Sequence, residues 1–474
     1  MRNQGKFAQH FHITPTEGLL NDPNGLCYFQ GYYHVFYQLN PYNTNHETKY
    51  WGHLRSKDMM HWEQLPIALK SDDWFDKNGV YSGSAIVHNE QLYLFYTGNT
   101  KDDQGVRNSY QCLATSSDGI NFEKHGPILE QAPGFTGHVR DPKVWWDEQL
   151  SGWWMILGAQ REDLTGDTIA YFSKDLLNWD YKGSILQFEE PLGYMWECPD
   201  LIFLTDEVTG EEKAVFIFSP QGLEPKGHRY HNIFNTTYIV GKWDNEQAQF
   251  IPEAESARNL AEVDGGFEFY APQTFTAPDG RTIQYAWMGT MWPEVEEAVP
   301  THRDKWIHHL SMPRSLHLVD NRLVQRPIVE TEALLSNEVQ QVKWDGNDLI
   351  ELPLANPSRI QIEGINNLTS DFNIMIDQAV HIQYKQLNQE LTIERINWHT
   401  KKAETRSVLL KEGVAQLDIW LDTSSLELFI NEGATTMSMR YFADKPHSKV
   451  TFQAEAISTP CDIKVTKLLA YQFS

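Results

Sequence analysis

Three short segments of the chain each place an acidic residue close to a proline. They are NDPNG with Asp22, RDPKV with Asp141 and ECPDL with Glu197. Two carboxyl groups on opposite sides of a glycosidic bond can hydrolyse it, because one attacks the anomeric carbon while the other, when protonated, gives a proton to the leaving oxygen. If the fold brings these acids together, they have the chemistry for glycoside hydrolysis.

Each segment taken alone also has an ordinary structural explanation. NDPNG is typical of a turn, RDP of a surface turn with a local ion pair, and ECPDL of a buried glutamate with a partner. The three together favour a different interpretation. If the fold brings three acids to one place, their negative charges repel one another, and this arrangement costs stability. A site that uses the acids would explain why the chain keeps all three.

The surroundings of the three acids predict different roles for them. Glu197 lies in the largely apolar segment YMWEC, so we expect its pKa to be raised and the group to be the proton donor. Asp22 lies between two asparagines, and we expect it to be ionised and to act as the nucleophile. Asp141 follows Arg140, and we expect it to be ionised and to hold sugar hydroxyl groups.

A repeat along the chain predicts how these segments are positioned. Strand-like aromatic runs begin at positions 32, 92, 153, 214 and 283, which are 60, 61, 61 and 69 residues apart by subtraction. A second marker recurs as SKDMMHW, SSDGINF and SKDLLNW. Each unit is rich in β-type and turn residues, as expected of a four-stranded antiparallel sheet. Five units predict a five-bladed β-propeller; a β-sandwich with accidental periodicity is the alternative.

The proline-containing segments fall at one point of this repeat. Four units have a proline there, at Pro23, Pro142, Pro199 and Pro272, and the other has YSGSA around Ser82. Proline is tolerated at the first residue of a strand, so we expect these segments to begin the innermost strand of each unit. In a propeller the innermost strands line the central channel, which would bring the three acids to one end of its axis.

The character of the sequence changes after the fifth repeat. Residues 1–318 are predicted to form the propeller, and residues 319–340, which include RLVQRPIVETEALL, a partly helical linker. From 341 to 474 β-rich runs alternate with turn signals, as in LDIWLDTSSLELFINEG, which predicts a β-sandwich. The fold class expected for the whole chain is therefore all-β.

The composition narrows the possible partners. A formal net charge of -25 repels nucleic acids and anionic membrane surfaces, so we expect neither as a partner. The segment MRNQGKFAQHFHITP has no apolar stretch of the kind found in signal peptides, which predicts a cytoplasmic protein. The 4 cysteines are scattered without metal-ligand spacing, so neither a metal nor another cofactor is expected. A small sugar is the expected substrate, and a monomer or homodimer the expected assembly.

The motifs together resemble those of glycoside hydrolase family 32, the invertase and fructanase family. The segments NDPNG, FYQLNP, WGH, SGSA, RDP, ECPDL and FEFYAPQTF occur in the order typical of that family. The resemblance implies a five-bladed propeller followed by a sandwich, retention at the fructosyl anomeric carbon, and the roles given above for the three acids. It also implies a set of substrate-binding residues, namely Asn21, Gln38, Trp51, Tyr81, Ser82, Arg140, Cys198, Tyr270 and Trp287.

Two of these positions carry further information. Tyr81 stands where the family usually has phenylalanine, which leaves the preference for the leaving group open. Cys198 follows the acid Glu197, and the resemblance implies that it tunes the proton affinity of that acid.

Within this family the chain looks most similar to bacterial sucrose-6-phosphate hydrolases, at YHNIFNTTYIVG and WIHHLSMPRSL. The similarity implies hydrolysis of sucrose 6-phosphate or sucrose. A phosphorylated substrate needs local positive charge in an acidic protein. The candidates for binding the phosphate are Lys49, Arg107, Arg229, Arg303 and His308. Each of them could instead be an ordinary surface residue.

Three other functions remain open from the sequence. One is an exo-acting β-fructosidase that degrades fructans with the same carboxylates. Another is an inverting enzyme of the arabinanase type, whose acids would be farther apart. The third is a carbohydrate-binding propeller without turnover, although the presence of all three acids argues against it.

Overall fold

The described residues form an all-β structure. The computed structural model describes residues 5–130, 132–258, 260–345, 349–365, 370–454 and 460–474. The α-helices in these ranges are α1 (Ala254–Arg258) and α2 (Pro293–Glu296), and no helix among them has the length and apolar character needed to cross a bilayer. The all-β class predicted from the sequence is confirmed. Residues 1–4, part of the segment MRNQGKFAQHFHITP, lie outside the described ranges.

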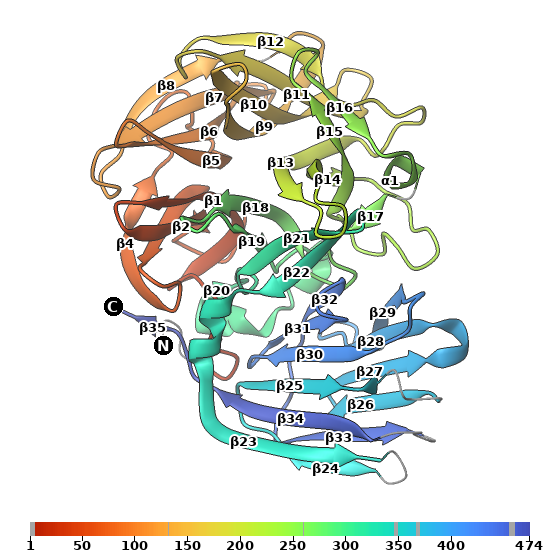
Figure 1. Cartoon of the computed structure of the whole chain (residues 1–474). Coiled ribbons are helices and arrows are strands. Elements are labelled where there is room, and N and C mark those ends of the chain that lie inside the picture. Colours follow the sequence, from red (N-terminus) through yellow and green to blue (C-terminus); the bar gives the residue numbers. More distant parts are fainter. Residues whose placement is uncertain (1–4, 131, 259, 346–348, 366–369, 455–459) are drawn as a thin grey trace.

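Five sheets are formed mainly by the chain up to Pro327 (Figure 1). The first sheet, in the order β20-β1-β2-β3-β4-β35, contains β1 (Gly18–Phe29), β2 (Tyr32–Asn40), β3 (Tyr50–Ser56), β4 (His61–Leu69), β20 (Trp306–Ile307) and β35 (Gln472–Phe473). The second contains β5 (Val80–His88), β6 (Gln91–Lys101), β7 (Arg107–Ser116) and β8 (Glu123–Leu129). The third contains β9 (Phe135–Asp147), β10 (Gly152–Arg161), β11 (Gly166–Ser173) and β12 (Trp179–Ser184).

The fourth and fifth sheets complete this part of the chain. The fourth contains β13 (Met195–Thr205), β14 (Glu212–Gln221), β15 (Thr237–Asp244) and β16 (Gln249–Pro252), with β17 (Ala261–Glu262) beside β15. The fifth contains β18 (Tyr270–Thr276), β19 (Thr282–Trp287), β21 (Arg314–Val319) and β22 (Arg322–Pro327). The five aromatic runs seen in the sequence are the second strands β2, β6, β10, β14 and β19. Their largely apolar sequences agree with strands that are buried on both faces.

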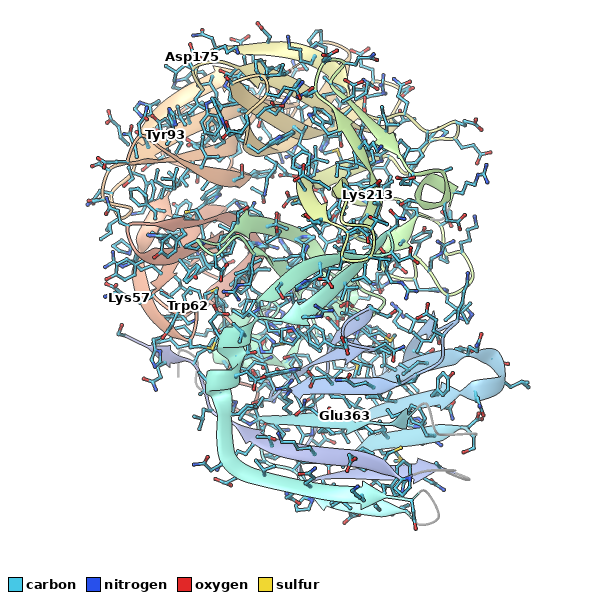
Figure 2. The ribbon with its side chains drawn as sticks, viewed as in Figure 1. Lys57, Trp62, Tyr93, Asp175, Lys213 and Glu363 are labelled. Atoms are coloured by element: carbon cyan, nitrogen blue, oxygen red, sulfur yellow. The ribbon has the colours of Figure 1, made fainter. Side chains whose placement is uncertain are left out.

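The recurring SKD and SSD segments form the turns that lead into the fourth strands of the first three sheets. In each turn an aspartate side chain accepts hydrogen bonds from two backbone amides that follow it, as Asp58, Asp118 and Asp175 do. This is a local turn that aspartate favours, which explains why the motif recurs. Figure 2 shows Asp175, and Lys57 of the first copy, at the outer edge of the molecule.

The first strands of the five sheets surround a common centre. They contact one another in a closed cycle of β1, β5, β9, β13 and β18 (Figure 1). Gln273 of β18 joins this cycle, because its Nε2 donates to the carbonyl oxygen of Gly83 at 2.6 Å and its Oε1 accepts from the amide of Leu26 at 3.0 Å. Its side chain therefore ties the fifth sheet to the first and the second.

All five first strands have an irregularity at the same point. The register with the second strand shifts between Leu20 and Pro23, Val80 and Gly83, Arg140 and Lys143, Glu197 and Asp200, and Tyr270 and Gln273. The prolines were predicted to stand first in their strands, and that prediction is wrong. They lie inside the strands at bulges, where a missing amide removes no regular ladder bond.

The remaining strands form two sheets packed face to face. One has the order β23-β34-β25-β30-β31-β32, with β23 (Leu335–Trp344), β25 (Ser358–Glu363), β30 (Gln416–Leu421), β31 (Ser425–Ile430), β32 (Thr435–Arg440) and β34 (Cys461–Leu468). The other has the order β24-β33-β26-β27-β28-β29, with β24 (Ile350–Pro353), β26 (Phe372–Ile376), β27 (Val380–Lys385), β28 (Glu390–Ile396), β29 (Ala403–Leu409) and β33 (Lys449–Ala454). Inward-facing aliphatic and aromatic side chains of both sheets form one hydrophobic core.

The segment 319–340 contains less helix than its sequence predicted. Arg322–Pro327 is strand β22, Val329–Leu334 is the 3₁₀ helix η2, and β23 begins at Leu335. Strand β22 pairs with β21 over the whole length of β22. The hydrogen bonds and packing of this pair outweigh the local preference for a helix.

Buried charged side chains connect the sandwich to the other sheets. His12 lies between two carboxylates of the sandwich, with Nδ1 2.8 Å from Asp422 and Nε2 2.9 Å from Glu427. Arg314 of β21 also binds Glu427, and its Nη1 lies 3.1 Å from Asp264. Losing one partner of such a buried pair typically costs about 3–5 kcal/mol, because the other charge remains buried.

The His12 contact predicts a pH-dependent stability. Burial lowers the pKa of His12, but the two hydrogen-bonded carboxylates outweigh burial and raise the pKa above the ordinary histidine value of 6.5. The stabilisation by the imidazolium is therefore complete below pH 6.5 and is lost as the pH rises through the folded-state value. We expect His12→Gln to lower the free energy of unfolding in urea by about 3 kcal/mol at pH 6, and by clearly less at pH 9. A pH-independent difference would contradict this role of His12.

Candidate active site

The bulges of β1 and β5 bring Asp22 next to Ser82. The Oγ of Ser82 donates a hydrogen bond to Oδ2 of Asp22 at 2.6 Å. Ser82 is buried and Asp22 is partly exposed. A bulge turns side chains away from the regular alternation of a strand, so both groups can point toward the centre of the five sheets.

Cys198 connects Asp22 with Asp141. The Cys198 amide donates to Oδ2 of Asp141 at 2.9 Å, and its Sγ lies 3.5 Å from that oxygen and 3.9 Å from Oδ2 of Asp22. Asp141 and Cys198 both have positive φ, 66° and 46°, at the bulges of β9 and β13. Residues other than glycine rarely adopt this conformation, and such local strain is concentrated at functional sites.

Glu197 is held by donors from three sheets. Its Oε1 accepts from Nη2 of Arg140 at 2.5 Å and from Nε at 3.1 Å. Its Oε2 accepts from the hydroxyl of Tyr270 at 2.5 Å and from Nε2 of Gln221 at 2.6 Å. Arg140 also approaches Asp141, with Nε 3.9 Å from Oδ2. Asp22, Asp141 and Glu197 are thus collected at one place, linked through Cys198 and Arg140.

The surroundings of Glu197 correct its predicted ionisation. Burial would raise its pKa, but the charge of Arg140 and the hydrogen bonds from Tyr270 and Gln221 outweigh burial and lower the pKa. The prediction of a raised pKa for Glu197 is therefore wrong. The apolar neighbours in sequence do not decide the pKa, because the donors come from other strands.

The two aspartates also differ from the prediction. Burial raises the pKa of Asp22 in spite of the hydrogen bond from Ser82, and the charge of Glu197 raises it further. Burial also raises the pKa of Asp141 to about 7 against the opposing effect of Arg140. Both aspartates were expected to be ionised, and both shifts oppose ionisation, because burial and the neighbouring carboxylates disfavour the charged forms.

Cys198 contributes a neutral group between the acids. Burial and the neighbouring charges of Asp141 and Asp22 raise the pKa of the Cys198 thiol well above the ordinary cysteine value of 9.0. The thiol therefore stays protonated at neutral pH and adds no negative charge to the site.

The predicted binding residues of the first two sheets surround Asp22. Asn21 is its neighbour and accepts a hydrogen bond from Lys49 at 2.5 Å. Gln38 and Trp51 are buried, and both support the segment before Ser82: Gln38 Nε2 donates to the carbonyl oxygen of Val80 at 2.8 Å, and Trp51 Nε1 to that of Tyr81 at 3.1 Å. These two side chains hold the bulge of β5 in place.

The fifth sheet supplies Tyr270 and Trp287. The two residues are directly opposite each other on β18 and β19, and their ring centroids are 6.4 Å apart. Tyr270 reaches Glu197, and Trp287 also packs against His308 at a centroid distance of 5.2 Å. This pair forms an aromatic side of the site, which suits a sugar ring.

Two residues of the site were not predicted. Gln221 is at the end of β14, opposite Met195, and His138 contacts Nη1 of Arg140 through its Nδ1 at 2.9 Å. A polar residue 3 positions after the end of an aromatic run at Phe218 was the available signal for Gln221, because the end of a second strand lies beside the bulge of the first. No comparable signal marks His138.

The five candidates for phosphate binding have different positions. Burial lowers the pKa of Lys49 to about 8, so the amine beside Asn21 is still largely charged at neutral pH. Arg107 lies over the ring of Tyr81 at 5.2 Å. Arg229 donates to the carbonyl oxygen of Leu260 at 2.8 Å, and Arg303 is exposed on η1 (Pro300–Asp304).

His308 does not supply the positive charge that was predicted for it. It is fully buried, and burial lowers its pKa to about 4 although it contacts Glu296 at 2.7 Å. The imidazole is therefore neutral at physiological pH, and its role in this structure is to pack against Trp287 and to bind Glu296.

A separate acidic cluster lies away from the three acids. Asp72, Asp73 and Asp76 are close enough for their carboxylates to share an ion. The Nζ of Lys124 already binds all three, at 2.7, 2.9 and 2.7 Å. This ammonium group neutralises part of their charge and accounts for the cluster without a metal.

In this all-β chain three carboxylates meet where five sheets surround a common centre, and comparison with known proteins identifies the chain as a glycoside hydrolase. Residues 12–327 match the glycosyl hydrolases family 32 N-terminal domain, and residues 330–468 match the family 32 C-terminal domain. The chain therefore belongs to glycosyl hydrolase family 32.

Individual relatives support this assignment over nearly the whole length. A sucrose-6-phosphate hydrolase of Bacillus subtilis is 41% identical over 460 residues, which cover 95% of this chain and 92% of that protein. A solved GH32 β-fructofuranosidase of Bombyx mori has a TM-score of 0.84 at 31% identity, covering 100% of this chain and 96% of the other. The sucrose-6-phosphate hydrolase of Lactobacillus gasseri has a TM-score of 0.86 at 29% identity, covering 99% and 94%.

Proposed function

We propose that this enzyme hydrolyses the β-fructofuranosidic bond of sucrose 6-phosphate and of sucrose, releasing fructose together with glucose 6-phosphate or glucose. The observation that carries the proposal is the convergence of Asp22, Asp141 and Glu197 around Cys198 and Arg140. Two of the relatives reported above are named sucrose-6-phosphate hydrolases, and these names indicate the substrate. A phosphorylated substrate also fits the cytoplasmic location expected from the sequence.

The proposal includes the architecture and its boundaries. Residues 1–318 would be a five-bladed β-propeller, 319–340 a connecting segment and 341–474 a β-sandwich. The closed cycle of five first strands supports the blade count. In a propeller these strands line the channel, which accounts for acids from β1, β9 and β13 at one channel mouth.

In the proposed mechanism Asp22 attacks the anomeric carbon of the fructosyl group while Glu197 gives a proton to the glycosidic oxygen. This forms a fructosyl ester on Asp22 and releases the glucosyl part. Water then attacks the same carbon, Glu197 takes its proton, and Asp22 leaves as a carboxylate. Asp141 and Arg140 hold sugar hydroxyl groups and stabilise the charge that develops in the transition state.

The first step needs a protonated Glu197 and an ionised Asp22. The pKa of Glu197 is lowered by Arg140, Tyr270 and Gln221 in spite of burial, and the pKa of Asp22 is raised by burial, so both shifts oppose the first step. Sugar hydroxyl groups that donate to Asp22 and Asp141 would favour the ionised forms of both aspartates. The ionised form of Glu197, which its three donors favour, is the form that accepts a proton from water in the second step.

The stereochemistry of the reaction tests this mechanism. Proton NMR of a reaction with sucrose is expected to detect β-fructofuranose as the first-formed anomer, because two successive displacements retain the configuration. First appearance of the α anomer would indicate an inverting enzyme and contradict a nucleophilic Asp22. Rates on inulin equal to those on sucrose would favour a fructan-degrading β-fructosidase instead.

A further inference from the structure

A row of basic side chains runs outward from Glu197. Arg140 binds Glu197, and His138 contacts Nη1 of Arg140 at 2.9 Å. Burial and the charges of Arg140 and Arg107 together lower the pKa of His138 to about 4. The backbone of Arg107 lies beside Gly137, the neighbour of His138, so the row continues from β9 to the beginning of β7.

Arg107 is not neutralised by an acid. Its Nη1 donates to Oδ1 of Asn99 at 2.9 Å, and its guanidinium lies 5.2 Å from the ring centre of Tyr81. No carboxylate of the described residues forms a salt bridge with it. In a chain with net charge -25, an arginine at the site without an acidic partner leaves several N–H donors available for an anion.

The backbone holds this row in place. A Cβ on Gly137 would lie 2.1 Å from the carbonyl oxygen of Arg107, so only glycine permits the close approach of the two strand ends. The Oγ of Ser109 donates to the carbonyl oxygen of Gly137 at 2.6 Å. These contacts keep His138 and Arg107 together whether or not a ligand is present.

The proposed chemistry decides which basic group faces the leaving sugar. Glu197 protonates the glycosidic oxygen, so the glucosyl part must lie on the side of Glu197 and away from Asp22. Lys49 binds Asn21, the neighbour of Asp22, and its charge acts on Asp22. The row of Arg140, His138 and Arg107 is on the side of Glu197.

We infer that Arg107, supported by His138, binds the phosphate of the leaving glucosyl group and so gives the enzyme its preference for a phosphorylated disaccharide. This inference rests on the proposed function. Guanidinium groups bind phosphate with two parallel hydrogen bonds, and Tyr81 keeps the planar group oriented. Tyr81, which stands where the family usually has phenylalanine, thus forms part of the proposed phosphate site.

The test compares two substrates on one variant. We expect Arg107→Gln to lower kcat/KM for sucrose 6-phosphate by about 10- to 100-fold, as loss of a charge-assisted hydrogen-bond pair predicts. We expect kcat/KM for sucrose to change by less than about threefold, since sucrose carries no phosphate. Arg107→Lys should recover part of the loss. Arg322→Gln removes the same charge from an exposed position on β22 and should change neither value.

The results separate failure of this inference from failure of the proposed function. Equal loss on both substrates, or no loss on sucrose 6-phosphate, would overturn the phosphate site. Binding of glucose 6-phosphate and glucose by calorimetry gives a second reading that needs no turnover. If the wild type hydrolyses neither disaccharide but binds glucose 6-phosphate through Arg107, the proposed function fails and the anion site stands.

Discussion

Replacing Asp22 by asparagine is expected to lower kcat on sucrose and sucrose 6-phosphate by at least about 10⁴-fold. An amide cannot form the fructosyl ester, so the reaction loses its covalent step while Asp141 and Glu197 remain in place. Steady-state rates measured with enough enzyme to detect slow turnover provide the test. A variant within tenfold of the wild type would exclude Asp22 as the nucleophile.

The stability of this variant provides its control. Burial raises the pKa of Asp22, so the ionised carboxyl group disfavours the folded state at neutral pH. A neutral asparagine of similar size can still accept the hydrogen bond of Ser82. We therefore expect the unfolding temperature of Asp22→Asn to equal or exceed that of the wild type at pH 7. A clear decrease would mean that lost activity reflects misfolding.

The second large effect is expected for Glu197→Gln, which should lower kcat/KM for sucrose by about 10²- to 10⁴-fold. Glutamine cannot protonate the glycosidic oxygen, and glucose without that proton is a poor leaving group. A β-fructosyl fluoride releases fluoride without general-acid help, so formation of the fructosyl enzyme should be largely preserved. Comparing both substrates distinguishes a proton donor from a group that only shapes the site.

The second step should then become limiting. The Glu197→Gln variant also lacks the base that activates water, so we expect a burst of fluoride equal to the amount of enzyme, followed by slow turnover. Azide needs no such base and should accelerate the slow phase. Equal losses on sucrose and on the fluoride, with no burst, would contradict the assigned role of Glu197.

Several features of the fold were accessible from the sequence because they depend on local patterns. The aromatic runs became second strands because apolar β-type residues favour strands buried on both faces. The recurring SKD segments became turns because an aspartate can accept bonds from the amides that follow it. The prolines indicated the correct position in each first strand. The sequence did not, however, distinguish a bulge inside a strand from the beginning of a strand.

The sequence by itself determined the repeated units, the position of each acid within them and most of the candidate site residues, though not Gln221 or His138. Only the tertiary structure decided how those groups ionise and what supports them. Glu197 receives its donors from Arg140, Gln221 and Tyr270, which are 57, 24 and 73 residues away in the chain. Likewise His308 is neutral because the fold buries it. A pKa depends on the burial and charges within a few ångströms, and residues distant in sequence supply those surroundings.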